Sequence, residues 1–465
     1  MEVIMQANEL REYFQQGDED QLKPSRYNYI EQGVCGCFIY NTLYSSLVYV
    51  TSQEYSEIIE GNPISKDMLH VLYNAGILVK RYLDERKAFL DMAKESREKN
   101  DSTFLCITTT MKCNARCHYC FEKNAKKTDF SYEQRKKLVD FIVKFLNKNQ
   151  SKKLDICWFG GEPLLGQDVI DYVVDELNKR NINFGTTMIT NGSLINKNLI
   201  AQKFNKWKLH SVQITLDGMA KTYRKTKNYI NAKDGDFRQM LQNIRDVAEA
   251  GINVSIRLNV DQRNFDEILA LSRMLEEEYR FAKGNISWYI GFVDGSEYNL
   301  TPEQKKDVIK RMYMQVYDED GIGRLTIPNF GYRTVTCSRK NKNALSIDID
   351  GNIYSCERSV GKEKEAMGTS FCVDDDVNEK RSVMNLSSKC MQCIFLPKCM
   401  GGCYAALRAG DELCFREKYI IQGYLEYLAE KQKKNPVLRL QMRRTNKRKR
   451  MRSRAIKMAV SMWEN

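Results

Sequence analysis

Apolar and β-branched residues come in short runs between residues 100 and 292, separated by segments with apolar residues at every third or fourth position. Short apolar runs bounded by polar turns are typical of strands, and the wider spacing is typical of helices. The predicted strands are Leu105–Thr110, Asp155–Phe159, Gly185–Thr190, Ser211–Leu216, Asn253–Val260 and Ile286–Phe292. Six strand–helix units favour parallel strands with right-handed crossovers. The pattern therefore predicts an α/β fold with a partial (β/α)6 barrel of the TIM type.

Two helices of this region have clear boundary signals. One begins after Ser131, where Gln134 completes a capping box, and the other stops at Gly251. Their apolar stripes are Leu138, Phe141, Ile142 and Phe145 in the first, and Phe237, Met240, Leu241, Ile244, Val247 and Ala248 in the second. Both helices can therefore cover one face of the predicted sheet.

The N-terminal region has a different pattern. Residues 1–24 are polar and predict no regular element. Residues 26–79 predict three strands, then two helices separated by a Gly-Asn-Pro break, then an apolar strand. The bounds are Tyr27–Glu31, Cys37–Tyr40 and Leu47–Thr51 for the strands, and Glu54–Glu60 and Lys66–Gly76 for the helices. This order suits a small winged-helix-like module, and a simple N-terminal cap on the next domain is the alternative. A charged helix over Tyr82–Asn100 would link it to the barrel.

Length and composition set the domain count and the compartment. A chain of 465 residues predicts two or three domains, which we place at 1–99, 100–325 and 326–430, followed by a tail over 431–465. No apolar run reaches the roughly 18 residues of a membrane span, and the N-terminus lacks a secretory pattern. Fifteen cysteines without an export signal indicate metal ligation in a reducing cytoplasm.

The net charge of +13 is a local property. Residues 431–465 contain 13 Lys or Arg and one acid, so the other 430 residues carry about +1. Such a tail can attract an acidic peptide or nucleic acid. It lacks the interleaved aromatic residues that stack on bases, so a solvated extension is favoured and a nucleic-acid partner is not.

Three cysteines carry the strongest chemical signal. Cys113, Cys117 and Cys120 follow the first barrel strand with the spacing Cys-x3-Cys-x2-Cys. Three thiolates on one loop can hold three irons of a four-iron cluster and leave one iron without a protein ligand. A zinc knuckle or buried thiols are the alternatives, but structural zinc sites use four ligands in two close pairs.

Together with Gly160-Gly161-Glu162-Pro163, this triplet resembles the radical SAM enzymes. The resemblance implies a cluster that binds S-adenosylmethionine (SAM) and cleaves it to a 5′-deoxyadenosyl radical, in an organism that lives with little oxygen. Sites in barrels of this kind gather at the carboxyl ends of the strands. The cysteine loop, the Gly160 run, Thr190-Asn191-Gly192 and Thr215-Leu216-Asp217-Gly218 all follow predicted strands.

The resemblance also implies contacts to SAM. Tyr119 matches the residue that contacts the adenine, and Gly160 and Gly161 match the glycines that let the backbone approach the methionine end. Glu162 would face the amino group, and Asn191 and Thr215 would bind the ribose or the carboxylate. Arg257 would pair with that carboxylate. For each of these polar residues the alternative is a structural role in the barrel, with its hydrogen bonds made to other protein groups. Thr215 stands where the family usually has Ser. A histidine often follows this run in the family; here Tyr223 stands nearby instead, and the resemblance implies no function for it.

A second set of cysteines resembles the SPASM extension, which houses two auxiliary iron–sulfur clusters, so that three [4Fe-4S] clusters are implied in all. By this resemblance the outer cluster is held by Cys390, Cys393, Cys399 and Cys414, and the inner one by Cys337, Cys356 and Cys403. The fourth inner ligand is left open between Cys372 and a substrate thiolate. A zinc ribbon on Cys390, Cys393, Cys399 and Cys403 is the alternative. We expect Cys35, Cys37, Cys106 and Cys157 to be buried thiols.

Glu357 directly follows Cys356. The anaerobic sulfatase-maturating enzymes have an aspartate at the matching position that acts as general base on the substrate radical. A glutamate offers the same chemistry with a longer reach. A surface charge is the alternative.

These resemblances imply a radical SAM enzyme that modifies a ribosomally made precursor peptide, forming a thioether or a carbon–carbon crosslink. The module at 26–79 is similar to the domains that recognise leader peptides. A flavodoxin or ferredoxin would supply electrons. The alternatives are a formylglycine-forming sulfatase maturase and an RNA-modifying iron–sulfur protein.

Overall fold

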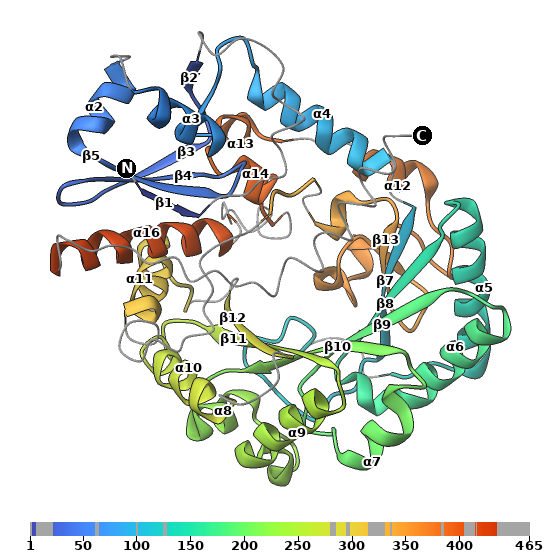
Figure 1. Ribbon diagram of the computed structural model, residues 1–465. Helices are drawn as coiled ribbons and strands as arrows, with labels where there is room; N and C mark the ends of the chain where they lie inside the picture. Colours follow the sequence, from blue (N-terminus) through green and yellow to red (C-terminus); the bar gives the residue numbers. More distant parts are fainter. Residues whose placement is uncertain are drawn as a thin grey trace. The chain divides into compact units, whose positions relative to one another are not determined.

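The computed structural model describes residues 2–5, 22–60, 65–98, 101–123, 128–279, 285–293, 298–314, 331–334, 337–382, 386–403, 414 and 416–434. The chain divides into two compact units, one of Met1–Tyr82 with Leu428–Asn465 and one of Leu83–Tyr427. Figure 1 shows the elements of both units. Each unit is described separately below.

An eight-stranded sheet forms the larger unit, in the order β12-β11-β10-β9-β8-β7-β13-β14. The six strands from β7 to β12 pair in parallel with their neighbours along the chain. They are β7 (Ser102–Thr110), β8 (Lys153–Gly160), β9 (Phe184–Thr190), β10 (Leu209–Leu216), β11 (Asn253–Val260) and β12 (Ile286–Phe292). All six predicted strands are confirmed, and so is the parallel α/β architecture; β11 and β12 have the predicted bounds.

Helices surround the convex side of these strands (Figure 1). They are α5 (Tyr132–Lys148), α6 (Gln167–Lys179), α7 (Lys197–Leu199), α8 (Ala220–Lys227), α9 (Phe237–Glu249), α10 (Glu267–Glu278) and α11 (Pro302–Met312). A further helix, α4 (Glu85–Glu98), precedes β7. The predicted capping box is present at the start of α5, where Ser131 accepts from the Gln134 backbone and Gln134 closes the box. The helix predicted to stop at Gly251 ends at Glu249.

The two faces of the sheet differ in polarity. Along β10, Val212, Ile214 and Leu216 are buried, whereas Gln213 and Thr215 are only partly buried. Ile214 lies on the helix side: a side chain added at Gly192 would meet both Ile214 and Met240 of α9. Burying a side chain of this size stabilises the fold by about 1.5–3 kcal/mol.

The opposite face carries polar side chains on β10 to β12, whereas on β7 to β9 it carries a small apolar cluster that includes Cys106, Cys157 and Phe159. On the polar strands the Tyr289 hydroxyl donates to Gln213 Oε1 at 2.6 Å. Because side chains alternate along a strand, the same face carries Thr215 and Arg257, which are direct register partners.

A hairpin extends the sheet beyond β7. β13 (Ala344–Ile347) is parallel to β7, and β14 (Ile353–Tyr354) returns antiparallel to it. Gly351 lies in the turn with φ +80°, which favours glycine. The region continues with α12 (Asp375–Ser382), α13 (Ser388–Gln392), α14 (Leu396–Cys399) and α16 (Arg416–Lys434).

The smaller unit contains an antiparallel sheet in the order β1-β5-β4-β3 and a separate β2–β6 pair. The strands are β1 (Glu2–Met5), β2 (Leu22–Pro24), β3 (Asn28–Gln32), β4 (Gly36–Asn41), β5 (Ser46–Thr51) and β6 (Leu78–Lys80), with helices α2 (Ser52–Glu60) and α3 (Lys66–Asn74). The core between sheet and helices includes Ile39, Val48, Val50 and Leu72. The three strands and two helices predicted over 27–76 are confirmed.

The expectation that residues 1–24 lack regular structure is wrong for β1 and β2. Glu2–Met5 pairs with β5, and Leu22–Pro24 pairs with β6. Strands of three or four residues are too short to show the alternation of apolar and polar residues that marks a strand in a sequence. They form here because a partner strand supplies hydrogen bonds to their backbone N–H and C=O groups.

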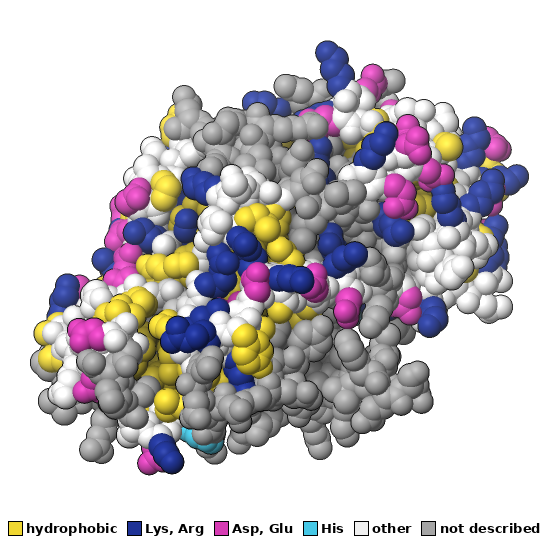
Figure 2. All heavy atoms as spheres, turned by 90° about the horizontal axis from the view of Figure 1, so that it is seen from above, with side chains coloured by type: hydrophobic (Ala, Val, Ile, Leu, Met, Phe, Trp, Pro, Cys, Tyr) yellow, Lys and Arg dark blue, Asp and Glu magenta, His cyan; other side chains and the backbone are white. Residues whose placement is uncertain are grey.

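The face drawn in Figure 2 carries charges of both signs. In Figure 2, basic and acidic side chains of the described residues lie interspersed on the visible face, with apolar side chains between them. Residues 435–465, most of the basic tail, lie outside the described residues. Among the described residues, no helix is both long and apolar enough to cross a membrane.

Candidate cofactor and cluster site

The three cysteines of the triplet lie on one loop after β7, and each is partly exposed. Backbone hydrogen bonds hold this loop against the segment that follows α8. Arg116 N–H donates to Lys227 O at 2.8 Å, and Ile230 N–H donates to Asn114 O at 2.8 Å. The loop therefore presents three thiols from a fixed backbone at the carboxyl end of the strands.

The loop after β8 is joined to the cysteine loop through Gly160 and Gly161. Gly161 N–H donates to Thr110 O at 3.0 Å, and Glu162 N–H donates to Lys112 O at 2.9 Å. A Cβ at Gly160 would come within 2.3 Å of Thr110 O, and one at Gly161 within 2.2 Å of Lys112 O. These glycines are thus needed for close contact between two protein backbones. Their approach to a ligand stays a prediction.

Glu162 is fully buried, and its carboxylate accepts hydrogen bonds from three protein groups. Oε1 accepts from Leu164 N–H at 3.1 Å and from the Thr190 hydroxyl at 2.7 Å, and Oε2 accepts from Asn191 N–H at 2.8 Å. Burial raises the pKa of Glu162, and these hydrogen bonds oppose the rise. The carboxylate therefore joins the loops after β8 and β9, a role that the sequence did not predict. A contact with an amino group stays a prediction.

Asn191 joins the same assembly to the cysteine loop. Its Nδ2 donates to Asn114 Oδ1 at 2.8 Å, and Asn114 Nδ2 donates to Ser193 Oγ and to Asp234 Oδ2. The loops after three successive strands are thereby fixed relative to one another.

Tyr119, Thr215 and Arg257, three of the predicted cofactor contacts, belong to one polar network. The Tyr119 hydroxyl donates to Asp217 Oδ1 at 2.8 Å. Lys227 Nζ donates to Thr215 Oγ1 at 2.6 Å and to the Tyr119 hydroxyl at 3.2 Å. The network thus connects the cysteine loop to the end of β10.

The network continues toward β11. Asn259 Nδ2 donates to Asp217 Oδ1 at 3.0 Å, and Arg257 Nε donates to Asn259 Oδ1 at 2.7 Å. The guanidinium lies where a Cβ at Gly291 would come within 2.5 Å of Arg257 Nε. Arg257 therefore depends on a glycine of β12 for its position.

Asp217 and Lys227 link these residues, and sequence reasoning missed both roles. They are 1% and 2% exposed and form an ion pair of 3.1 Å. Burial alone would lower the pKa of Lys227, but the nearby Asp217 carboxylate raises it well above its usual value. Lys227 lies four positions after Tyr223, on the same face of α8, but a lysine at that position gives no signal of burial in the sequence alone.

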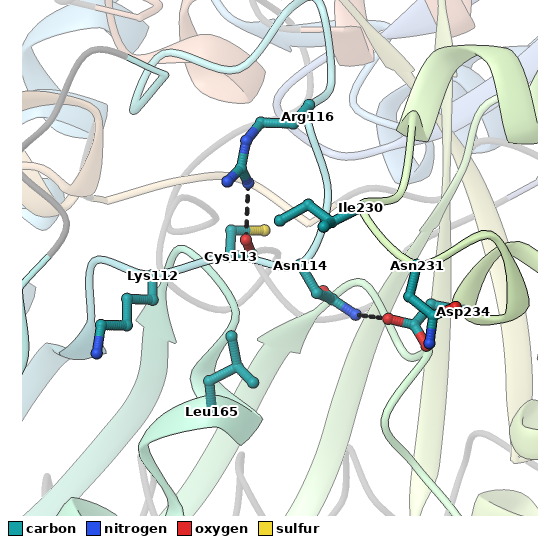
Figure 3. A pocket seen from close by; sticks show the side chains of 8 residues that line it. All are labelled: Lys112, Cys113, Asn114, Arg116, Leu165, Ile230, Asn231 and Asp234. Carbon is teal, nitrogen blue, oxygen red and sulfur yellow. Dashed lines mark hydrogen bonds between the residues drawn. The ribbon is translucent and has the colours of Figure 1, made fainter.

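A cavity of about 390 Å³ lies beside Cys113 (Figure 3). Its lining is Lys112, Cys113, Asn114, Arg116, Leu165, Ile230, Asn231 and Asp234. Figure 3 shows the Cys113 sulfur directed toward Ile230 and Arg116 donating to the Cys113 carbonyl. The volume falls in the range of small-molecule sites.

The donor set fits a thiolate-bound cluster. Burial raises the pKa of Cys117 to about 11, so its thiol stays protonated until a metal replaces the proton. Among the described residues, no group of three or more His, Cys, Asp or Glu side chains is arranged to hold a single metal ion.

The C-terminal cysteines fall into two electrostatic groups. Burial raises the pKa of Cys337, and Cys403 adds to the rise; burial likewise raises that of Cys356, and Cys337 adds to it. For Cys393, burial again raises the pKa, with Cys414 and Cys390 as its thiol neighbours. These thiol neighbours belong to the same set in each case, and ligation of two auxiliary clusters by the two sets stays a prediction.

Glu357 lies beside the inner set. The Cys356 thiol donates to Glu357 Oε2 at 3.5 Å, and Arg358 Nη1 donates to Cys403 Sγ at 3.9 Å. Cys372, the candidate fourth ligand, is exposed, and its thiol donates to Val373 O at 3.9 Å.

The remaining thiols differ from one another. Cys37, Cys106 and Cys157 are buried as predicted, but Cys35 is exposed, so that expectation is wrong for Cys35. It lies in the turn before β4, outside the hydrogen-bonded strand that buries Cys37.

Comparison with known proteins identifies a domain within the larger unit. Residues 107–275 match the Radical SAM superfamily, a range that contains the end of β7, the cysteine loop and the strands β8 to β11. The chain therefore carries a radical SAM domain, and proteins with this domain use SAM and a [4Fe-4S] cluster.

Two curated relatives extend beyond that domain. The chain is 25% identical over 327 residues to the cysteine-type anaerobic sulfatase-maturating enzyme of Clostridium novyi, covering 63% of this chain and 84% of that protein. It is 22% identical over 397 residues to the radical SAM cyclopropyl synthase TigE of Paramaledivibacter caminithermalis, covering 78% and 80%.

Solved structures agree on the fold. A polyhistidine-tagged form of anSMEcpe with bound AdoMet has a TM-score of 0.55 at 17% identity, covering 70% of this chain and 96% of that one. Native anSMEcpe with bound AdoMet and the Kp18Cys peptide has a TM-score of 0.55 at 16% identity, covering 71% and 98%.

Proposed function

We propose that this protein is a radical SAM peptide maturase with two auxiliary clusters. The observation that carries the proposal is the loop of Cys113, Cys117 and Cys120, with three partly exposed thiols beside a cavity at the carboxyl ends of the strands. These cysteines would hold the catalytic cluster. When bound, the cluster and SAM supply a 5′-deoxyadenosyl radical that abstracts hydrogen from a substrate.

The protein's own residues would bind and orient SAM where β10 to β12 carry polar side chains. Tyr119, Thr215 and Arg257 are held there by hydrogen bonds to Lys227 and Asn259. Because their neighbours fix these side chains, they can orient a ligand without first losing rotamer freedom.

A peptide substrate is supported by the fold likeness to a protein whose structure contains a bound peptide and by the module over 26–79. In the smaller unit β3 is an edge strand of its sheet, and such an edge can accept an added peptide strand. We propose that this module binds the leader of a precursor.

Glu357 is proposed as the base that removes a proton from the oxidised substrate. It lies next to Cys356 of the proposed inner cluster, which is a suitable place for electrons to leave. If a substrate cysteine ligates that cluster, the product is a thioether; otherwise a carbon–carbon crosslink is expected.

The first test is anaerobic SAM cleavage. The protein is reconstituted with iron and sulfide, supplied with SAM and a strong reductant, and assayed for 5′-deoxyadenosine. A variant with Cys113, Cys117 and Cys120 changed to Ala should form none, and a Cys35→Ala control should match the wild type. A fully iron-loaded wild type that forms no product would overturn the proposal.

The second test addresses the substrate. The surroundings of the gene are searched for a short cysteine-bearing reading frame, the enzyme is incubated with the peptide that it encodes, and the product is fragmented by mass spectrometry. A crosslink, with a mass two hydrogens below that of the peptide, supports the maturase. A Cα-formyl residue at a Ser or Cys would favour sulfatase maturation instead, which the likeness to the Clostridium novyi protein makes the second candidate.

A further inference from the structure

The segment after α8 holds the cysteine loop at several points. Arg116 N–H lies 2.8 Å from Lys227 O and 3.1 Å from Asn228 O, and Ile230 N–H donates to Asn114 O at 2.8 Å. Asn228 adopts the left-handed conformation with φ +46°, which ends α8 and turns these carbonyls toward the loop. The backbone of Lys227 therefore already anchors the residue before Cys117.

The side chain of Lys227 makes a second connection to the same loop. Its ammonium contacts the hydroxyl of Tyr119, the residue before Cys120, at 3.2 Å. The ammonium also lies 3.1 Å from Asp217 Oδ2 and 2.6 Å from Thr215 Oγ1. Lys227 thus contacts the cysteine loop twice, through its backbone carbonyl and through its side-chain ammonium.

Stability alone does not explain this ion pair. Taking two charges out of water costs several kcal/mol per ion, and replacing a buried pair by apolar residues is often neutral or stabilising. The backbone hydrogen bonds would hold the loop without any charge. Both charges lie against the cysteine loop: the Tyr119 hydroxyl lies 3.2 Å from Lys227 Nζ and 2.8 Å from Asp217 Oδ1, and the Cys117 thiol donates to Lys227 O at 3.9 Å.

We propose that the Lys227–Asp217 pair sets the reduction potential of the cluster held by Cys113, Cys117 and Cys120. The inference rests on the proposed function. Reduction adds one negative charge to the cluster. A nearby ammonium stabilises that charge and a nearby carboxylate opposes it, with energies that are large where water is excluded. Lys227 is thus a positioning residue whose charge also acts on the reaction centre.

The test is a charge series in the full-length, reconstituted protein. The variants are Lys227→Met, Asp217→Asn and the double variant, which give the pair net charges of −1, +1 and 0, against 0 in the wild type. Lys225→Met is the matched control, because Lys225 is an exposed lysine of the same helix. The midpoint potential is measured by redox titration of the reduced-cluster EPR signal, with iron content determined on each sample.

Lys227→Met should lower the ratio of reduced to oxidised cluster at a fixed potential about tenfold, which corresponds to about 59 mV for a one-electron couple. Asp217→Asn should raise the ratio, and the double variant and Lys225→Met should lie near the wild type. If Lys227→Met does not retain iron, the rise in Asp217→Asn decides the question alone.

Two failures can be distinguished. Variants that all shift in one direction, or not at all, would make the pair purely structural and overturn the inference while leaving SAM cleavage by the wild type intact. A wild type without a reducible cluster would overturn the proposed function, and the inference with it.

Discussion

Thr190 donates its hydroxyl to the Glu162 carboxylate across 2.7 Å, and both residues are buried. The first comes at the end of β9 and the second directly follows β8. Their hydrogen bond connects two loops that reach the cysteine loop by separate routes, Glu162 through Lys112 O and Asn191 through Asn114.

Glu162→Gln should destabilise the protein by about 1–3 kcal/mol. The carboxylate accepts three hydrogen bonds, and an amide nitrogen in place of one oxygen would face a donor and leave it unsatisfied in the interior. The free energy of unfolding by urea, measured anaerobically, checks this. Glu133→Gln serves as control, because Glu133 is exposed in the first turn of α5. Equal stability of both variants would contradict the role given to Glu162.

Gly161→Ala should reduce iron incorporation at the catalytic cluster by severalfold. Its Cβ would lie 2.2 Å from Lys112 O, so the backbone before Cys113 must move. Iron content after reconstitution and the yield of 5′-deoxyadenosine are the measurements. Gly331→Ala is the control, since its Cβ would meet nothing within 4 Å. Wild-type loading in Gly161→Ala would show that the two loops can separate without harm.

The barrel was predictable because each of its strands carries its own signal. β11 and β12 have the expected bounds, since an apolar run ends there at a polar turn. β1 and β2 gave no such signal, because strands so short are defined by their partners. The pairing of β13 with β7 joins residues more than 230 positions apart, and no local pattern encodes that contact.

The candidate site was predictable in its residues but not in its connections. The sequence points to Tyr119, Thr215 and Arg257 independently of one another, and the structure joins them through Lys227 and Asn259. A lysine at the end of an amphipathic helix usually faces solvent. Only the fold, which places that helix end against the cysteine loop, buries it.

Cys356→Ala and Cys390→Ala should each remove one auxiliary cluster and leave the other. Their thiols have different neighbours, Cys337 in one case and Cys393 in the other. Each variant should lose about four irons, and the double variant about eight. Iron and sulfide analysis with EPR provides the count. Zinc, rather than iron, lost from Cys390→Ala would instead indicate a zinc ribbon.

Loss of all auxiliary iron from either single variant would contradict the two-group assignment. The catalytic cluster offers an internal reference for this experiment, because its three proposed ligands lie on the loop after β7. Its SAM-dependent EPR signal should persist in all three variants.

The Cys106→Ala, Cys157→Ala double variant should keep full iron content but lose about 1–3 kcal/mol of stability. The two cysteines are direct register partners on β7 and β8, both are buried, and they pack with Phe159 in a small apolar cluster. Removing the sulfurs leaves a cavity in a packed interior, whereas neither sulfur belongs to the proposed ligand sets. Urea unfolding and iron analysis on the same preparation separate these effects. Cys35→Ala, at an exposed cysteine, should change neither quantity.

A drop of about four irons in the double variant would instead make one of these thiols the missing ligand of the inner cluster, whose ligand Cys356 acts electrostatically on Cys106.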